Sequence, residues 1–171
     1  MPDATDDGAM QLDLVAKVLI LLAVANGAPL VAKKALGDVL THPLDGGRTL
    51  SDGQPLFGSS KTIRGLAVGV AAPLLVAPLL GMTWTTGLLV GAAAMAGDLL
   101  SSFLKRRMGM APSSRAFGLD HFFESLLPAL AAMTQIDLTL LDVLAVAAVF
   151  TAGGQLLSAL LFKMRLRDHP H

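Results

Sequence analysis

Carboxylates inside apolar runs are the first residues in this sequence that could do chemistry. Asp98 lies seven residues before Lys105, so at helical rise its carboxylate sits about 10 Å inside an apolar run. Asp120 and Glu124 lie one helical turn apart on one face of a second run. A charged side chain in hydrocarbon costs about 2.5 to 3.5 kcal/mol, so it needs a neighbouring cation or a bound proton. We therefore expect Asp98 to be functional.

A Gly-, Ser- and Thr-rich segment supplies a second chemical signal. It reaches the start of a predicted helix with hydroxyl and basic side chains, namely Ser59, Ser60, Lys61, Thr62 and Arg64. Free backbone amides and the helix dipole favour a phosphate group at such a position. The segment is not a Walker P-loop, because Ser59 and Ser60 separate Lys61 from the last glycine and no strand precedes it. It favours phosphate binding, and a flexible linker is the alternative.

Three consecutive cations, Lys105, Arg106 and Arg107, end the apolar run that contains Asp98. A basic helix end on its own serves as a topology anchor. Together with the deep acid and the phosphate-favouring segment, however, these cations indicate a metal ion and a polyphosphate. The sequence therefore predicts nucleotide chemistry at a membrane surface.

The elements that must position these residues are transmembrane helices. Of the 171 residues 53% are hydrophobic and 15% are charged, and the mean hydropathy is +0.63, which is too apolar for an ordinary soluble domain. A membrane crossing needs about 20 apolar residues. We predict an all-α integral membrane protein, a single membrane domain of five transmembrane helices. The predicted spans are residues 12–35, 63–82, 84–104, 119–136 and 138–162.

The basic residues predict how these helices are oriented. Twelve of the thirteen Lys and Arg residues flank or fill the segments 36–62 and 105–118 or follow the last span, and Lys17 is the exception. Because Lys and Arg are retained on the cytoplasmic side, these segments become two long cytoplasmic loops. The N-terminus is then outside and the C-terminus cytoplasmic. This predicts a multi-pass protein of the cell membrane whose active site faces the cytoplasm.

Composition excludes several other functions. Lys plus Arg equals Asp plus Glu at 13 each, and Tyr is absent, so no basic or aromatic surface indicates a nucleic-acid partner. The chain has no Cys, which excludes a disulfide framework, a thiolate nucleophile and a Cys-based zinc site. Any metal must therefore bind oxygen or histidine. The oligomeric state is not predicted.

Polar residues of four spans form one layer near the cytoplasmic boundary. Asn26 and Gln155 lie at a depth similar to that of Asp98, and Asp120 and Glu124 enter from the loop side. Asn26 and Gln155 could each merely hold helices together. A small ion or solute carrier is an alternative that explains the layer. It does not explain why the cations gather on one side, and we find no inverted repeat of the kind many carriers show.

The motifs resemble those of a known enzyme family. Ser102–Arg106 matches the Ser-x-Leu-Lys-Arg start of the signature of CTP-dependent phosphatidate cytidylyltransferases. The closer resemblance is to the small CDP-archaeol synthases, which are similar in length. They share Phe-Gly-x-x-Lys-Thr-x-Arg-Gly at 57–65, Gly-Asp-Leu with Ser and Lys-Arg-Arg at 97–107, and Gly-Leu-Asp at 118–120.

The resemblance implies cytidylyl transfer, in which a lipid phosphate oxygen attacks the α-phosphorus of CTP and pyrophosphate leaves. It implies Asp98, Asp120 and Lys105 as catalytic residues and Mg²⁺ as the cofactor. It implies Asp98, Asp120 and Glu124 as the metal ligands. The implied CTP- and phosphate-binding residues are Lys61, Thr62, Arg64, Ser102, Arg106 and Asn26. CTP, a membrane lipid phosphate and the bilayer are the implied partners.

Two features of the resemblance leave alternatives open. In the larger phosphatidate enzymes the second acid follows the first by three residues, whereas here that position is Phe123 and the next acid is Glu124. Glu124 faces the same side as Asp120, so it is the candidate replacement. The lipid is either an archaeal ether-linked phosphate or ester-linked phosphatidic acid, because Leu, Val and Ala suit both kinds of hydrocarbon chain.

Overall fold

The computed structural model describes residues 10–111 and 119–163, and this part of the chain is helical. Its elements are α1 (Leu12–Leu36), α2 (Ile63–Val76), the 3-10 helix η1 (Ala77–Leu80), α3 (Trp84–Arg107), α4 (Leu119–Ala132) and α5 (Leu140–Lys163). Extended pairing within the described residues is limited to isolated bridges in the loop between α1 and α2. The predicted all-α class is confirmed.

Three of the predicted spans are supported by the length and apolar character of the described helices. Among the described helices α1, the α2–η1 segment Ile63–Leu80 and α3 are long and apolar enough to cross a bilayer. The 14 residues of α4 cover about 21 Å and end at Ala132, before the predicted limit at 136. The chain leaves the helix there in a turn closed by backbone bonds from Thr134 and Gln135. Membrane crossing by α4 and α5 stays a prediction.

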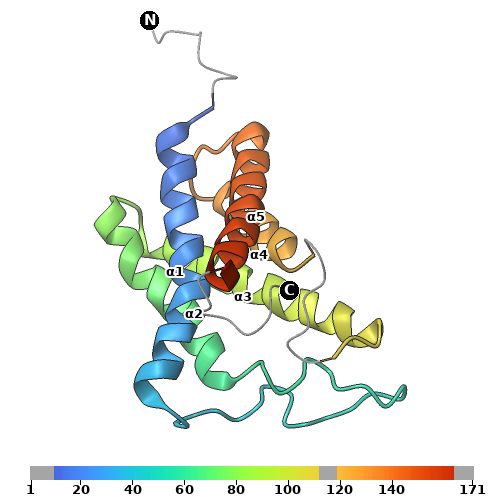
Figure 1. Cartoon of the computed structure of the whole chain (residues 1–171). Coiled ribbons are helices and arrows are strands. Elements are labelled where there is room, and N and C mark those ends of the chain that lie inside the picture. The colour runs from blue at the N-terminus through green and yellow to red at the C-terminus, as the bar shows by residue number, and fades with distance from the viewer. Residues whose placement is uncertain (1–9, 112–118, 164–171) are drawn as a thin grey trace, which may run out of the picture.

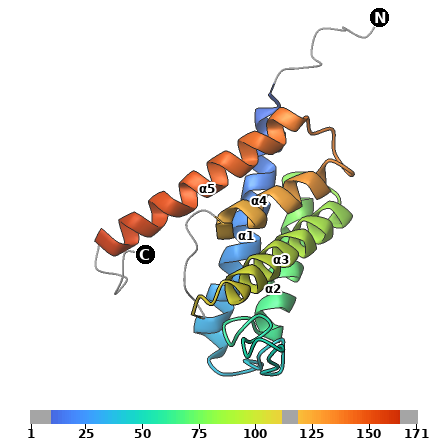
Figure 2. The ribbon, with the colours of Figure 1, turned by 90° about the vertical axis from the view of Figure 1, so that its right-hand side faces the viewer.

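Consecutive helices pack against each other (Figure 1), and the most extensive contact joins α3 to α4. In the rotated view α4 lies between α3 and α5 (Figure 2). Glycines bring α3 close to α2: a Cβ atom on Gly87 would lie 2.3 Å from the carbonyl oxygen of Pro73, and one on Gly91 would lie 2.9 Å from that of Val70. Only glycine permits such an approach of two helix backbones.

Polar contacts define two ends of the bundle. At one end the backbone N–H of Gln11 donates to Asp142 over 2.8 Å, and Thr85 donates to Gln135 over 3.4 Å. The start of α1, the start of α3 and the α4–α5 turn therefore meet at this end. At the other end the loop between α1 and α2 contacts the last residue of α3, Arg107. The helices thus alternate in direction, as chain crossings of a membrane do.

Candidate active site

Asp45 organises the loop that leads to the predicted phosphate-binding segment. Its carboxylate is buried and accepts hydrogen bonds from the backbone N–H groups of Gly47, Phe57 and Gly58 over 2.9 to 3.0 Å. Burial raises the pKa of this carboxyl group, but the three backbone donors outweigh burial, and the pKa lies below its ordinary value. One side chain therefore fixes two distant parts of the loop against each other.

The loop then enters α2 in a fixed geometry. The backbone N–H of Leu44 donates to the carbonyl oxygen of Lys61 over 2.7 Å. Thr62 is the N-cap of α2, and its hydroxyl oxygen accepts the backbone N–H of Gly65 over 3.1 Å. Such a cap stabilises a helix start by about 1 kcal/mol. The main chain at Lys61 is thus held on both sides, and its side chain reaches Asp98 of α3.

Arg64 does not join the other predicted phosphate-binding residues. Its guanidinium is buried and donates to the carbonyl oxygens of Gly37 and Val39, each over 2.7 Å. These carbonyls follow the end of α1, where helical carbonyl groups lack partners. In the structure Arg64 therefore ties the end of α1 to the start of α2, and its phosphate-binding role stays a prediction.

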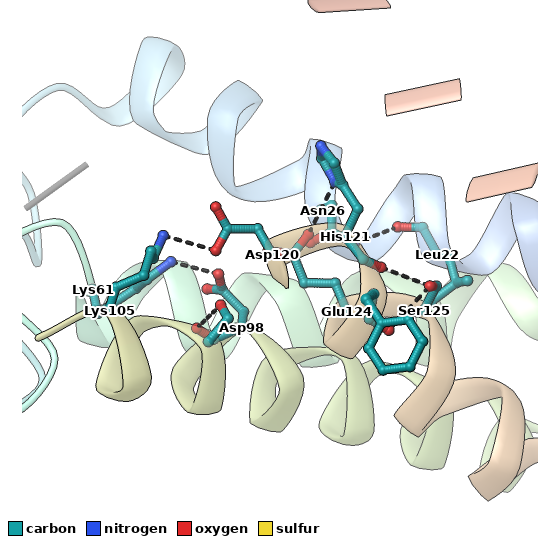
Figure 3. A network of polar contacts seen from close by, with 11 residues as sticks. Leu22, Asn26, Lys61, Asp98, Lys105, Asp120, His121, Glu124 and Ser125 are labelled. Atoms are coloured by element: carbon teal, nitrogen blue, oxygen red, sulfur yellow. Dashed lines mark hydrogen bonds and ion pairs between the residues drawn. The ribbon is translucent and has the colours of Figure 1, made fainter. Parts of the chain in front are cut away.

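Two lysine–aspartate ion pairs lie side by side at this end of the bundle (Figure 3). Lys61 Nζ lies 2.5 Å from Asp98 Oδ1, although the residues are 37 positions apart in sequence. Lys105 Nζ lies 2.8 Å from Asp120 Oδ1. The four side chains are 9 to 22% exposed, so both pairs are largely shielded from water and still reachable from it. The structure thus provides the deep acids with the cations that they need.

Glu124 extends this cluster toward the interior. Its carboxyl group is close enough to that of Asp98 for the two to interact, and Glu124 Oε2 lies 3.8 Å from His121 Nδ1. The helices meet at Gly97, where a Cβ atom would lie 2.3 Å from the carbonyl oxygen of Phe123. Two adjacent carboxylates repel each other when both are ionised, so this arrangement favours a bound cation.

The donor set fits magnesium held together with a substrate. No three or more His, Asp or Glu side chains gather into a metal-binding group among the residues that the structure describes. Mg²⁺, however, takes one or two carboxylates and completes its shell with water and substrate phosphates. Asp98 with Glu124, and the neighbouring Asp120, supply oxygen donors of that kind. These residues would hold the ion only as part of a complex with a polyphosphate.

Arg106 is a candidate anion-binding residue. It is 1% exposed, and its Nη2 donates to the carbonyl oxygen of Ala111 over 2.7 Å. Its Nε and Nη1 atoms find no hydrogen-bond partner within residues 10–111 and 119–163. Buried donors without partners are costly, and a guanidinium binds phosphate oxygens through two parallel bonds. Ser102 is also buried, one helical turn before Arg106.

The third cation of the run, Arg107, holds the loop in place. Its guanidinium pairs with Asp52 Oδ2 at 2.5 Å and donates to the carbonyl oxygen of Pro55 over 2.7 Å. The group also lies 5.3 Å from the centre of the Phe103 ring. The backbone N–H of Gln54 lowers the pKa of Asp52, and Arg107 lowers it further. Sequence analysis assigned Arg107 only to the basic helix end and missed this role and that of Asp45.

The remaining polar-layer residues behave differently from one another. Asn26 donates to the carbonyl oxygen of Leu22 in its own helix over 3.1 Å (Figure 3). Gln155 is exposed and lines an apolar hollow of about 430 Å³ between α4 and α5, whose lining includes none of the acids. Whether Asn26 and Gln155 share one polar layer with the acids stays a prediction. Gly118 of the predicted motif lies outside the described residues.

The helical fold with its long apolar helices, taken together with the comparisons with known proteins, defines a multi-pass membrane enzyme of lipid biosynthesis. The family model described as CarS-like CDP-archaeol synthase matches residues 11–171. The chain belongs to the CDP-archaeol synthase family, as the sequence motifs predicted.

Individual relatives agree with this assignment. The chain is 34% identical over 152 residues to a CDP-archaeol synthase of Pyrobaculum calidifontis, covering 86% of this chain and 90% of that one. A CDP-archaeol synthase of Methanopyrus kandleri is 43% identical over 95 residues, 50% of this chain and 55% of that one. A solved structure described as an intramembrane enzyme for archaeal membrane lipids biosynthesis has a TM-score of 0.66 and 28% identity. It covers 86% of this chain and 91% of that one.

Proposed function

We propose that this protein transfers the cytidylyl group of CTP to the phosphate of a membrane lipid, forming a CDP-lipid and pyrophosphate. One observation in the structure carries the proposal. The ion pairs Lys61–Asp98 and Lys105–Asp120 lie at the same end of α3 as the Nε and Nη1 atoms of Arg106, which have no hydrogen-bond partner among the described residues. The family name further supports an archaeal ether lipid phosphate as the substrate, and ester-linked phosphatidic acid is the alternative.

The reaction requires little proton transfer. A lipid phosphate oxygen forms a bond to the α-phosphorus, and the bond from that phosphorus to the bridging oxygen breaks as pyrophosphate leaves. The attacking phosphate is already ionised near neutral pH, so no strong general base is needed. Negative charge accumulates on the leaving group. Lys105 and Arg106, which are both buried near the end of α3, are the cations that would stabilise it.

Mg²⁺, when bound, would screen the triphosphate and orient its α-phosphorus. Asp98, Glu124 and Asp120 are the residues that would hold it. The ammonium groups of Lys61 and Lys105 each contact a carboxylate oxygen of one of these acids, Asp98 and Asp120 respectively. The packing of α3 against α4 at Gly97 keeps Asp98 close to Glu124. The lipid chains remain in the bilayer while the phosphate reaches the acids.

We infer that α4 and α5 also cross the membrane, with the N-terminus outside and the active site facing the cytoplasm of the cell membrane. The alternating directions of the helices and the basic residues around the loop support this topology. The chain has no Cys, so single cysteines can report it. Thr85→Cys and Met108→Cys, both at exposed positions, should react with an impermeant thiol reagent from opposite sides. Reaction of both from one side would contradict the topology.

A turnover assay tests the function. Purified protein is given CTP, Mg²⁺ and either the ether-linked or the ester-linked lipid phosphate, and CDP-lipid and pyrophosphate are measured. Asp98→Asn keeps the shape of the side chain and should lower the rate by orders of magnitude, because an amide is a poor Mg²⁺ ligand. Asp13→Asn is the control, since Asp13 pairs with Lys17 at the other end of the bundle. If the protein turned over CTP with neither of the two lipid phosphates, or if Asp98→Asn kept a normal rate, the proposal would be contradicted.

A further inference from the structure

Two of the three acids expected to hold a metal ion, Asp98 and Asp120, are already paired with lysines. Lys61 Nζ lies 2.5 Å from Asp98 Oδ1, within the first coordination sphere that a cation at this oxygen would occupy. Lys105 Nζ lies 2.8 Å from Asp120 Oδ1. A second positive group at the same carboxylate is repelled by the ammonium group, although the carboxylate has two oxygens. A metal ion at Asp98 therefore competes with the ammonium group of Lys61.

We propose that Lys61 is an exchangeable counter-ion that makes divalent-cation binding depend on the nucleotide. In the ligand-free protein Lys61 neutralises Asp98, and it moves to the triphosphate only when nucleotide and metal ion bind together. This inference rests on the proposed function. It adds an order to the binding events, because the metal ion alone binds weakly and the metal–nucleotide complex binds well.

The local backbone permits this exchange. The carbonyl oxygen of Lys61 accepts the N–H of Leu44, and the neighbouring Thr62 caps α2, so the main chain is fixed on both sides. The side chain of Lys61 is 21% exposed and has a flexible four-carbon stem. Rotation about side-chain bonds alone can carry its ammonium group away from Asp98. No rearrangement of a helix is needed.

Charge compensation explains why the nucleotide is required. A divalent cation arriving alone would leave the ammonium group of Lys61 partly buried without a partner, which is unfavourable. A triphosphate arriving with the cation offers that group phosphate oxygens, with which it forms a charge-assisted hydrogen bond. Only the combined ligand leaves both Asp98 and Lys61 with partners. A permanent structural ion pair would instead make Lys61 essential for stability and would keep its ammonium group at Asp98 when the nucleotide binds.

Binding of Mn²⁺, measured by electron paramagnetic resonance on the full-length protein in detergent, tests this inference without turnover. Wild-type protein is compared with Lys61→Met, which removes the charge and keeps much of the volume, and with Lys61→Arg, which keeps the charge. Lys17→Met is the matched control, because it breaks a 2.7 Å Lys–Asp ion pair at the other end of the bundle. Each protein is titrated with Mn²⁺ alone and with Mn²⁺ plus the α,β-methylene analogue of CTP.

Loss of the competing ammonium group should tighten binding of Mn²⁺ alone by about tenfold in Lys61→Met, the factor that corresponds to about 1.4 kcal/mol. The analogue should improve Mn²⁺ binding in wild-type protein and in Lys17→Met, and improve it much less in Lys61→Met. Lys61→Arg should behave like wild type. Asp98→Asn should abolish the tightened binding in the Lys61→Met background, which places the ion at Asp98.

Unchanged or weaker binding of Mn²⁺ alone in Lys61→Met would overturn the inference. If that variant unfolds in detergent, Lys61→Gln, which also lacks the charge, replaces it with the same expectation. Failure of the two proposals is distinguishable. Absence of CTP turnover in wild-type protein contradicts the proposed function. If wild-type protein turns over CTP but Lys61→Met binds Mn²⁺ alone with unchanged affinity, only the exchange is contradicted.

Discussion

The contact at Gly97 leads to a sharp prediction about how the acids are positioned. A Cβ atom at this position would lie 2.3 Å from the carbonyl oxygen of Phe123 and 2.7 Å from its carbonyl carbon. Both neighbours are helix backbone, so neither can rotate away. Gly97→Ala must therefore move α3 and α4 apart by about 1 Å, the difference between this distance and an ordinary van der Waals contact.

The magnitude follows from two opposing effects. Replacing Gly by Ala inside a helix stabilises it by about 0.5 to 1 kcal/mol, and overpacking a core costs about 1 to 3 kcal/mol. We expect Gly97→Ala to lower the free energy of unfolding by about 1 to 2 kcal/mol. The effect on catalysis should be larger. Asp98 is the next residue, and a displacement of about 1 Å in catalytic groups can cost about 100-fold in rate.

Thermal unfolding in detergent and the CTP turnover assay together measure these effects. Gly27→Ala is the control, because a Cβ atom on Gly27 of α1 meets no described atom within 4 Å. That variant should be as stable as wild type or more stable, with a normal rate. If Gly97→Ala kept both the wild-type stability and the wild-type rate, the close approach of α3 and α4 would not position the acids.

Three further predictions concern the contacts around the site and at the opposite end of the bundle. Asp45→Asn should destabilise the protein by about 1 to 3 kcal/mol, as measured by thermal unfolding. The asparagine NH₂ group would replace a carboxylate oxygen that accepts hydrogen bonds, so donors would face donors. Because the pKa of Asp45 is lower in the folded state, its ionised carboxylate stabilises the fold at pH values above the unfolded-state pKa. This stabilisation is lost as the pH falls through the folded-state pKa, and Asp45→Asn should not show this pH-dependent loss of stability. Arg107→Gln should make the loop 37–62 several-fold more sensitive to a protease in limited proteolysis. Asp142→Asn should lower the unfolding temperature and leave CTP turnover unchanged, because its carboxylate forms a capping box with Thr139 far from the acids.

The sequence predicted the helices well because each is a long apolar run. The end of α4 was harder to place. Ile136 continues the apolar pattern, and hydropathy alone does not show that the chain turns at Thr134 and Gln135 through local backbone bonds. Orientation relative to a bilayer depends on how Lys and Arg residues interact with the membrane, and contacts within the protein do not report that interaction. Five crossings therefore stay a prediction even though the helices are described.

Prediction of the candidate site succeeded where a charge needed a partner. Asp98 and Asp120 were identified because a carboxylate in an apolar run must be compensated, and the structure places a lysine against each. Which lysine pairs with which acid depends on the path of the loop. Arg64 illustrates the limit: its residue type suits phosphate, but the carbonyl oxygens that it contacts belong to residues 25 and 27 positions away. Such contacts have no local sequence signal.

The way in which Asp45 holds the loop has a consequence for how the sequence can vary. Its partners are the backbone N–H groups of Gly47, Phe57 and Gly58, and every residue except proline supplies such a group. The exposed side chains of this loop, such as Arg48, contribute nothing to these bonds. Exposed positions other than the glycines at positive φ, such as Gly46 and Gly47, can therefore accumulate substitutions while the loop keeps its shape. The tolerance of this surface to evolutionary change thus depends on one buried carboxylate.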